Sequence, residues 1–568
     1  MEPVFPDYTP TVPGLLAAGA ERFASGDAVV TPTGRLSYAE LDRQSRRLAG
    51  RLVQAGVVKG TKVGILFPNG IPWVLSWAAA TRIGAVAVPV NTFYRPPELI
   101  RFLRHSDVQV LIGTDTFIQH DYVERLETSV PGLADYGPGP IYLPELPQLR
   151  RVLLWGPSRR PWTEGGLGDD LEGTGAAGGS ADRTRAGAPA GTGAGLPGLG
   201  DVVDAMGDDV TPGEVMLVTY TSGSTGEPKG VVHSHGALIR QATNLAGLSG
   251  IDSDSRLWTP MPLCWVGGFA FTLLRARSVG AAFITQEVLD GGEALALMAR
   301  ERATVVSAWP AVSKTLREHP DFPATDLSSL RSGSFYEAMP PDRRPADPSL
   351  AVSSLGMSET CGPHTFWRLG EETGSPPEYR GSFGHEVPGT EHRIIDPETG
   401  EVLPEGTEGE VLVRGYNLML GLYRQERSAV FDSDGWYHTG DRGYFRDGWF
   451  FFTGRQGDLI KTAGSNVAPI EVETALLGCP GVKLAFVMGV PHPDREQDVV
   501  ALVVPVPEAA GELSEDAMRA DLREKLSSYK VPRRIAVITD ADVPWLTSQK
   551  ADKRGLSAMA EKIFADRS

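Results

Sequence analysis

Cysteine is scarce in this chain. Only three of its 568 residues are cysteines, and they stand far apart at Cys264, Cys361 and Cys479. An odd and scattered set of this kind provides neither a disulfide framework nor the paired spacing of a zinc site. Unpaired cysteines are typical of a reducing compartment. The scarcity argues against a small disulfide-bonded secreted protein, and we expect a cytoplasmic one.

Positive charge and long apolar runs are lacking as well. Lysine and arginine number 54 against 71 acidic residues, which gives a formal net charge of −17. Such a chain is repelled by nucleic acid and by anionic membrane surfaces. No stretch reaches the roughly 20 apolar residues of a membrane span, and the opening residues MEPVFPDYTP show no export signal. We therefore expect no nucleic-acid partner and no membrane span, and an anionic substrate must meet cations that are gathered locally.

The length of the chain and the order of its patterns predict an α/β protein with at least two domains. A chain of 568 residues exceeds the size of a single hydrophobic core. Strand-like runs at 61–66, 108–112 and 303–307 alternate with helical patterns at 38–55 and 293–301. This alternation is typical of layered helices and of mixed or parallel sheets.

Residues 164–198 differ from the rest of the chain. Glycine and alanine dominate them, and they contain too few large apolar groups to offset the entropy of ordering. We expect a disordered surface insertion there.

The segment 221–230, TSGSTGEPKG, combines glycines, hydroxyls and a lysine. It follows an apolar run, 214–220, that reads as a buried strand, so its backbone N–H groups can converge on an anion at the strand end. Glycines allow close approach to a phosphate, and the lysine supplies positive charge. The spacing differs from GxxxxGK[ST], so this is no ordinary NTPase loop, and a flexible surface turn is the alternative. The candidate phosphate-binding residues are Thr221, Ser222, Gly223, Ser224, Thr225, Gly226 and Lys229.

Further motifs follow this loop in a fixed order. They are PLCWVGG at 262–268, GMSET at 356–360, GWYHTGD at 435–441, GRQGD at 454–458, and Lys550 near the C-terminus. Together with the loop they resemble the adenylate-forming superfamily of acyl-CoA synthetases, carrier-protein adenylation domains and luciferases. The resemblance covers nearly the whole chain and is strongest to an acyl-CoA synthetase. It implies a large N-terminal domain, 1–456, and a small mobile α+β lid domain, 457–568, with a hinge at Gly457.

The resemblance implies a two-step reaction. A carboxylate attacks the α-phosphorus of ATP to give acyl-AMP and pyrophosphate, and the thiol of coenzyme A then attacks the acyl carbon and expels AMP. ATP, Mg²⁺ and coenzyme A are the implied cofactors, and a small-molecule carboxylic acid is the substrate. Glu359, together with Thr221, would hold Mg²⁺ on the triphosphate, because hard oxygen ligands suit that ion. Lys550 would orient the carboxylate and the α-phosphate and neutralise developing charge.

The remaining site residues are also implied by the motif matches. Asp441 would accept hydrogen bonds from the ribose hydroxyls, and Arg455 would donate to the nucleotide. After the lid rotates, Gly464 would leave room for a pantetheine tunnel. Lys461 would serve as a second active-site lysine; a surface lysine at a strand end is the alternative. The adenine-side residues would be Ser334, Phe335, Leu355, Gly356, Met357 and Ser358.

Trp265 stands where the family commonly has a histidine. We expect it to form an aromatic gate between the carboxylate and thiol sites; a buried core tryptophan is the alternative. The other expected walls of the acyl pocket are Phe269, Tyr336 and Cys361. Walls of this kind predict an apolar acyl group without fixing its length or ring content.

Three departures from the family pattern affect ATP binding. Leu355 replaces a tyrosine that usually forms a wall for adenine, Ser334-Phe335-Tyr336 replaces a small Gly-Ala-Pro, and Gln549 replaces a glycine beside Lys550. Either Phe335 or Tyr336 supplies the missing stacking surface, or adenylation is impaired.

Our leading hypothesis is an ATP- and Mg²⁺-dependent acid–thiol ligase that makes an acyl-CoA. The alternatives are a ligase that mainly converts a supplied acyl-AMP, a free-standing adenylation enzyme that loads a carrier protein, a luciferase-like oxidase, and a non-catalytic nucleotide-binding relative. The sequence leaves open the acid, the acceptor, and whether the chain forms a homodimer.

Overall fold

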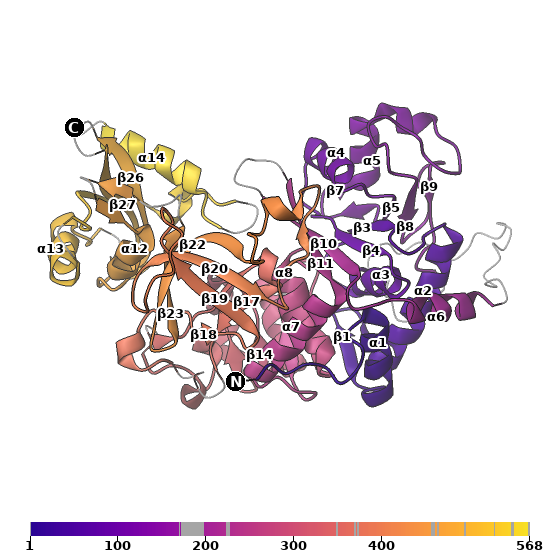
Figure 1. Cartoon of the computed structure of the whole chain (residues 1–568), viewed down its shortest axis with the longest axis horizontal. Coiled ribbons are helices and arrows are strands. Elements are labelled where there is room, and N and C mark those ends of the chain that lie inside the picture. The colour runs from indigo at the N-terminus through magenta and orange to yellow at the C-terminus, as the bar shows by residue number, and fades with distance from the viewer. Residues whose placement is uncertain are drawn as a thin grey trace. The chain divides into compact units, whose positions relative to one another are not determined.

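The structure is a computed structural model of the whole chain (Figure 1). It describes residues 2–169, 171, 198–222, 228–347, 350–368, 371, 374–455, 460–462, 465–492, 496–509, 511–526, 529–546 and 550–565. By packing, the chain divides into two compact units. The first unit comprises 1–391 and 414–435, and the second comprises 392–413 and 436–568. The expected hinge, Gly457, lies outside the described residues, so the boundary at 456–457 stays a prediction.

The first unit contains an eight-stranded sheet in the order β21-β11-β10-β4-β3-β5-β8-β9. The strands from β10 to β9 run parallel, whereas β11 is antiparallel to both β10 and β21. The strand bounds are β21 Gly421–Leu422, β11 Pro228–Ser234, β10 Val215–Ser222, β4 Val86–Pro89, β3 Lys62–Leu66, β5 Val110–Gly113, β8 Arg151–Leu154 and β9 Thr163–Glu164.

A six-stranded sheet in the same unit has the order β15-β14-β12-β13-β1-β2. Its strands are parallel except for β2, which is antiparallel to β1. The bounds are β15 Ser332–Gly333, β14 Val305–Val306, β12 Arg256–Trp258, β13 Ala282–Ile284, β1 Asp27–Val30 and β2 Arg35–Ser37. A small antiparallel sheet follows, with β16 Leu355–Met357, β17 Gly362–Phe366 and β18 His385–Glu386.

Eleven helices accompany these sheets among the described residues of the first unit. They are α1 Val12–Arg22, α2 Tyr38–Gln54, α3 Ile71–Arg82, α4 Pro96–His105, α5 Tyr122–Ser129, α6 Leu199–Asp208, α7 His235–Leu248, α8 Val266–Gly268, α9 Arg275–Ser278, α10 Gly291–Arg300 and α11 Pro310–Arg317. No helix in the described parts of the chain is long and apolar enough to cross a membrane.

The alternating burial of residues along the strands shows that the first unit has five layers, in which two sheets alternate with three layers of helices. In β4, Ala87 joins a central core with α2, α3 and α7, while Val86 and Val88 join a second core with α4 and α5. In β1, Val29 joins the central core and Val30 joins a third core with α10 and α11. Because successive strand residues point to opposite faces, both sheets are covered on both sides. The central helices therefore lie between the two sheets.

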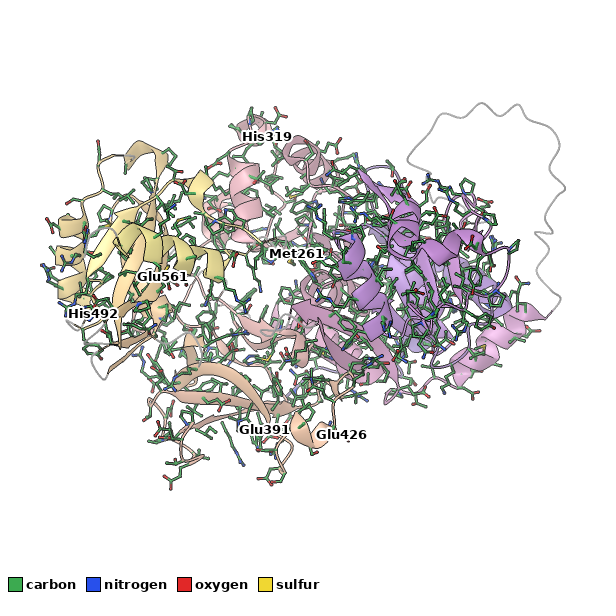
Figure 2. All side chains as sticks on the ribbon, turned by 90° about the horizontal axis from the view of Figure 1, so that it is seen from above. Met261, His319, Glu391, Glu426, His492 and Glu561 are labelled. Carbon is green, nitrogen blue, oxygen red and sulfur yellow. The ribbon has the colours of Figure 1, made fainter. Side chains whose placement is uncertain are left out.

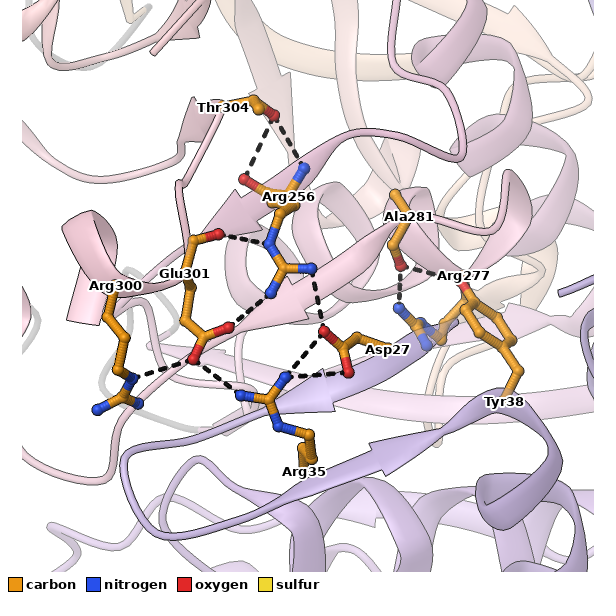
Figure 3. A network of polar contacts seen from close by, with 9 residues as sticks. All are labelled: Asp27, Arg35, Tyr38, Arg256, Arg277, Ala281, Arg300, Glu301 and Thr304. Atoms are coloured by element: carbon orange, nitrogen blue, oxygen red, sulfur yellow. Dashed lines mark hydrogen bonds and ion pairs between the residues drawn. The ribbon is translucent and has the colours of Figure 1, made fainter. Parts of the chain in front are cut away.

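The amino ends of the six-stranded sheet are joined by a network of ion pairs (Figure 3). Arg256, which begins β12, donates to Asp27 Oδ2 at 3.0 Å and to Glu301 Oε2 at 2.6 Å. Arg35 of β2 donates to the same two carboxylates, at 3.1 and 3.0 Å. The Glu301 side chain is only 5% exposed, and a buried charge is stable only with such partners. The network holds the amino edge together, and the opposite, carboxyl edge is where open parallel sheets bind ligands.

The second unit contains two antiparallel-rich sheets. The first has β19 Thr390–Ile395, β20 Gly409–Gly415, β22 Tyr437–Arg446 and β23 Trp449–Arg455, in that order. The second has β25 Ser465–Val467, β24 Ile460–Thr462, β27 Glu496–Pro505 and β26 Val482–His492, with β28 Arg534–Val537 parallel to β27. Helices α12 Pro469–Leu477 and α13 Glu515–Lys525 cover one face of this sheet, and α14 Lys553–Ala565 covers the other (Figure 1).

Several local predictions agree with these elements. The expected strands 61–66, 108–112 and 214–220 correspond to β3, β5 and β10, and the expected helices 38–55 and 293–301 correspond to α2 and α10. The run 303–307 forms only the two-residue strand β14. Of the predicted insertion, residues 164–169 hold backbone hydrogen bonds to 154–156, so the folded part reaches at least Asp169. Most of the remainder, 172–197, lies outside the described residues.

Candidate functional site

The segment TSGSTGEPKG connects two antiparallel strands of the first unit. It leaves the end of β10 and returns as β11, and its tip, residues 223–227, lies outside the described residues. Gly223, Ser224, Thr225 and Gly226 therefore remain predicted site residues, as does Ser222, whose side chain is not described. At the base of the hairpin Thr221 is directly opposite Lys229. Opposed residues of an antiparallel pair project from the same face, so their side chains point the same way.

Lys229 links this hairpin to the GMSET segment. Its Nζ lies 2.6 Å from Oε1 of Glu359, and the two side chains are 28% and 12% exposed. The fold thus brings together three residues that stand far apart in the sequence: Thr221, Lys229 and Glu359. Two of them are the oxygen donors expected to hold Mg²⁺, and the third is the cation expected to meet phosphate.

The turn that carries Glu359 is held from β11 by a buried histidine. Nε2 of His233 lies 2.7 Å from the Ser358 carbonyl oxygen, and Nδ1 lies 3.2 Å from Sγ of Cys361. Burial lowers the pKa of His233 from 6.5 to about 4, so the ring is neutral at pH 7. A neutral ring with Nε2 protonated donates to Ser358 and accepts the Cys361 S–H at Nδ1. Through these two contacts, His233 supports the turn that carries Glu359.

The turn is also held by residues that follow β20. The Met419 N–H donates to the Glu359 carbonyl at 2.8 Å, and Asn417 Nδ2 donates to the Thr360 carbonyl at 3.3 Å. Thr360 Oγ1 in turn donates to the Gly362 carbonyl at 2.7 Å. The backbone of GMSET is therefore fixed by both sets of contacts, which leaves the Glu359 side chain pointing at Lys229 in a defined place.

The carboxyl edge of the six-stranded sheet gathers aromatic side chains. Trp265 follows β12 and Trp309 follows β14; both are half-buried, and their ring centroids lie 5.5 Å apart. Tyr336 follows β15 and is 38% exposed. Ser334 Oγ accepts from the Ala308 N–H at 2.9 Å, which joins the ends of β14 and β15. Trp265 is thus not the buried core tryptophan of the alternative interpretation. Figure 2 labels Met261, at the start of the segment that carries Trp265.

Three expected pocket residues are instead core residues. Phe335 has no exposed surface and packs against Phe322, and Phe269 contacts Trp73 and Trp77 in the central core. Cys361 is 1% exposed and contacts His233. These side chains have almost no accessible surface, so the adenine-side role expected of Phe335 and the acyl-pocket roles expected of Phe269 and Cys361 stay predictions. Of the two aromatic candidates for stacking on adenine, only Tyr336 has an accessible ring.

The other expected adenine-side residues lie along the β16–β17 hairpin. Leu355, Met357 and Ser358 are half-buried, and Gly356 is exposed in the middle of β16. Their place next to the Glu359 turn follows from the chain order, and their accessible surface leaves them available to a ligand.

In the second unit, Asp441 and Arg455 are brought together by the β22–β23 hairpin. They are direct partners in its register, and Arg455 Nε donates to Asp441 Oδ1 at 2.9 Å. The Asp441 side chain is 4% exposed and that of Arg455 is 65% exposed. Gly440 and Gly454 precede these residues with φ values of +70° and +140°, where a side chain would be strained. The glycines of the two motifs therefore shape the backbone that presents the pair.

Lys550 is an exposed residue at the base of a loop in the second unit. Its carbonyl accepts from the Leu546 N–H at 2.8 Å, and Trp545 bridges to Ala551. Gln549, Gly464, Gly457 and the side chain of Lys461 lie outside the described residues, so the roles expected of the last three remain predictions.

A basic groove in the first unit has no counterpart in the sequence predictions. It has a volume of about 710 Å³ and lies along α4 and the end of α5. Arg101 and Arg104, one turn apart on α4, are exposed in it, and Arg424 lines it while holding Asp107 at 2.7 Å. The spacing of the two arginines on one helix face was available in the sequence, but the groove itself depends on the packing of α5 and of Arg424.

Comparison with known proteins agrees with this arrangement. The sequence profile of the AMP-binding enzyme family matches residues 16–423, and that of the AMP-binding enzyme C-terminal domain matches residues 471–550. A feruloyl-CoA synthase of Amycolatopsis sp is 32% identical over 88% of this chain and 89% of its own. The mitochondrial medium-chain acyl-CoA ligase ACSF2 of Mus musculus is 27% identical over 93% of this chain and 84% of its own.

The fold is likewise similar to solved structures. The amide bond synthetase McbA from Marinactinospora thermotolerans is 26% identical, with a TM-score of 0.74 over 97% of this chain and 99% of that one. The expected α/β class, with a large N-terminal part and a small C-terminal one, is confirmed, and so is the resemblance to the adenylate-forming superfamily. The chain belongs to the family of AMP-binding enzymes and is an AMP-forming acid–thiol ligase.

Proposed function

We propose that this ligase joins a small carboxylic acid to coenzyme A in two steps, through an acyl-AMP. The observation that carries the proposal is the convergence of Thr221, Lys229 and Glu359 at the base of the β10–β11 hairpin. A hydroxyl, an ammonium and a carboxylate at one place match the needs of a magnesium-bound triphosphate.

In the first step the acid's carboxylate attacks the α-phosphorus and pyrophosphate leaves. Lys229 contacts a carboxylate now, and a triphosphate would offer it further anionic partners. Glu359 and Thr221 fit Mg²⁺, because that ion commonly takes one or two protein carboxylates and completes its shell with phosphate and water. Bound magnesium neutralises phosphate charge. The backbone contacts of the GMSET turn keep Glu359 in place during this step, so little reorganisation is needed.

The residues of the second unit would act on the same nucleotide. Asp441 presents a carboxylate fixed by Arg455 and can accept hydrogen bonds from ribose hydroxyls. Arg455, which is largely exposed, can donate to the nucleotide through its other nitrogens. Lys550 would reach the reacting carboxylate and the α-phosphate and offset the charge that develops there.

In the second step a thiol attacks the acyl carbon and AMP leaves. The basic groove supports coenzyme A as the acceptor, because the 3′-phosphate and diphosphate of that molecule need local cations in a chain of net charge −17. A carrier protein bears phosphopantetheine without the 3′-phosphoadenosine, so the groove favours coenzyme A over a carrier protein. Gly464 would leave room for the pantetheine, and Lys461 would lie beside it.

A second candidate function is a ligase that mainly converts a supplied acyl-AMP. The burial of Phe335 favours it, because one of the two aromatic side chains that could replace the lost adenine wall is in the core. Tyr336 is then the remaining candidate for stacking on adenine.

One experiment separates these functions. A pool of carboxylic acids is incubated with the enzyme, ATP, Mg²⁺ and coenzyme A. A parallel pool of synthetic acyl-adenylates is incubated with the enzyme and coenzyme A but without ATP. Mass spectrometry then detects new thioesters in each pool. Thioesters in both pools support the complete ligase. Thioesters from the adenylates alone support the second candidate, and thioesters in neither pool contradict both.

A further inference from the structure

Two tryptophans occupy positions where tryptophan is a poor choice for local stability. Trp265 is the N-cap residue of α8 and Trp309 is the N-cap residue of α11, and within the described structure neither makes a side-chain capping hydrogen bond. Serine, threonine, aspartate and asparagine are preferred at this position because their side chains accept from the first helical N–H groups. Two large aromatic N-cap residues that lie side by side are consistent with a functional role.

The two tryptophans differ from most others in the chain by their exposure. Trp73, Trp77, Trp162, Trp258 and Trp436 are buried in cores, whereas Trp265 and Trp309 are half-buried at the carboxyl edge of the six-stranded sheet. Their rings meet at 5.5 Å and 59°. This distance leaves no room for a third ring between them, so together they form one continuous surface.

The position of Trp309 is rigidly supported. Its ring packs against the core of α10 and α11, and the Ala308 N–H next to it donates to Ser334 Oγ at 2.9 Å. The carbonyl of Ser334 accepts from Ser313 Oγ at 3.2 Å, and that of Ser307 accepts from Thr259 Oγ1 at 2.6 Å. The hydroxyls of Ser334, Ser313 and Thr259 are therefore engaged with the backbone, whereas the two tryptophan side chains keep accessible surface.

We propose that Trp309 is a specificity-determining residue and that, with Trp265, it forms an aromatic wall that selects acids with a planar, aromatic acyl group. The proposal rests on the proposed function and names the substrate class of the same site. Two rings inclined to one another offer an edge and a face to a third ring, which can make offset or edge-to-face contacts with both. A saturated ring of the same size gains only the burial of its apolar surface.

The test uses pairs of acids with the same carbon skeleton: benzoate against cyclohexanecarboxylate, and 3-phenylpropanoate against 3-cyclohexylpropanoate. The ratio of kcat/KM within each pair cancels differences in ATP and coenzyme A handling. Aromatic contacts of this type should make kcat/KM about 2- to 10-fold higher for the aromatic acid than for its saturated counterpart. We expect that preference in the native enzyme, its retention in Trp309→Phe, and its loss in Trp309→Leu. Trp155→Leu, which changes another half-buried tryptophan, serves as the matched control and should keep the native ratio.

A binding measurement keeps this test independent of turnover. Non-hydrolysable acyl-sulfamoyl adenosines that carry the phenyl or the cyclohexyl group are titrated by calorimetry against the native enzyme and Trp309→Leu. Tighter binding of the phenyl compound, with the difference lost in Trp309→Leu, supports the wall even if no acid is converted, in which case only the proposed function fails. Equal affinities in the native enzyme, or an unchanged preference in Trp309→Leu, overturn the proposal.

Discussion

His233 makes the stability of this enzyme depend on pH in a way that one substitution can isolate. The side chain is fully buried, and burial lowers its pKa from 6.5 to about 4. The unfolded chain therefore binds a proton between these values while the folded chain does not. The contribution of the neutral ring is complete above pH 6.5 and is lost as the pH falls towards 4.

The size of the effect follows from the two pKa values. One pKa unit corresponds to about 1.4 kcal/mol, and integration between the native and unfolded values gives a loss of roughly 2 kcal/mol at pH 5. His233→Gln keeps an N–H donor for the Ser358 carbonyl but cannot titrate. We expect it to be slightly less stable than the native enzyme at pH 7.5 and to lose about 2 kcal/mol less than the native enzyme on going to pH 5. His235, which is also buried with its pKa lowered to about 4, remains in both proteins and cancels in the comparison.

Urea unfolding followed by circular dichroism at pH 5, 6 and 7.5 measures this difference. His233→Leu is the companion variant, because it leaves the buried Ser358 carbonyl without its donor, at a cost of about 1–3 kcal/mol relative to His233→Gln at every pH. It should also raise KM for MgATP more than it lowers kcat, since the turn that carries Glu359 loses a support. If the pH dependence of stability is the same in His233→Gln and in the native enzyme, the reasoning about the buried neutral ring is wrong.

Three further predictions concern other parts of the molecule. Glu301→Gln removes the buried carboxylate that Arg256 and its neighbours share and should destabilise the first unit by about 1–3 kcal/mol; thermal unfolding measures the change, and an unchanged midpoint would remove the network's assigned role. Arg104→Ala should raise KM for coenzyme A several-fold but leave KM for 3′-dephospho-coenzyme A unchanged; an equal rise for both would place the 3′-phosphate elsewhere. Lys550→Ala should suppress acyl-AMP formation, measured by pyrophosphate exchange, while a supplied acyl-AMP is still converted to thioester; parallel loss of both activities would contradict its role.

The sequence predicted those features that depend on local pattern. The strand before the TSGSTGEPKG loop and the helix 38–55 are readable because periodicity and glycine positions act over a few residues. The ion pair between Lys229 and Glu359 follows the expected grouping, although 130 positions separate the two.

The differences between the expected and the observed side-chain directions have a common physical origin. Phe335 and Phe269 were expected to face ligands because they stand beside motif residues, but neighbouring strand and helix residues point in different directions, and these two point into cores. Trp309 was missed for the converse reason. Nothing in its own segment marks it, and only the parallel pairing of β12 with β14 places it next to Trp265. The contact of His233 with Ser358 likewise depends on tertiary packing that a pattern in the sequence does not reveal.

The most direct test of the two-step account follows an oxygen atom. An accepted acid labelled with ¹⁸O in both carboxylate oxygens is incubated with the enzyme, ATP, Mg²⁺ and coenzyme A, and the AMP is analysed by mass spectrometry. Attack of the carboxylate on the α-phosphorus forms a bond through one labelled oxygen, and attack of the thiol then breaks the acyl–oxygen bond, so AMP should leave with one ¹⁸O atom. Unlabelled AMP, or label found in inorganic phosphate instead, would contradict the acyl-AMP pathway.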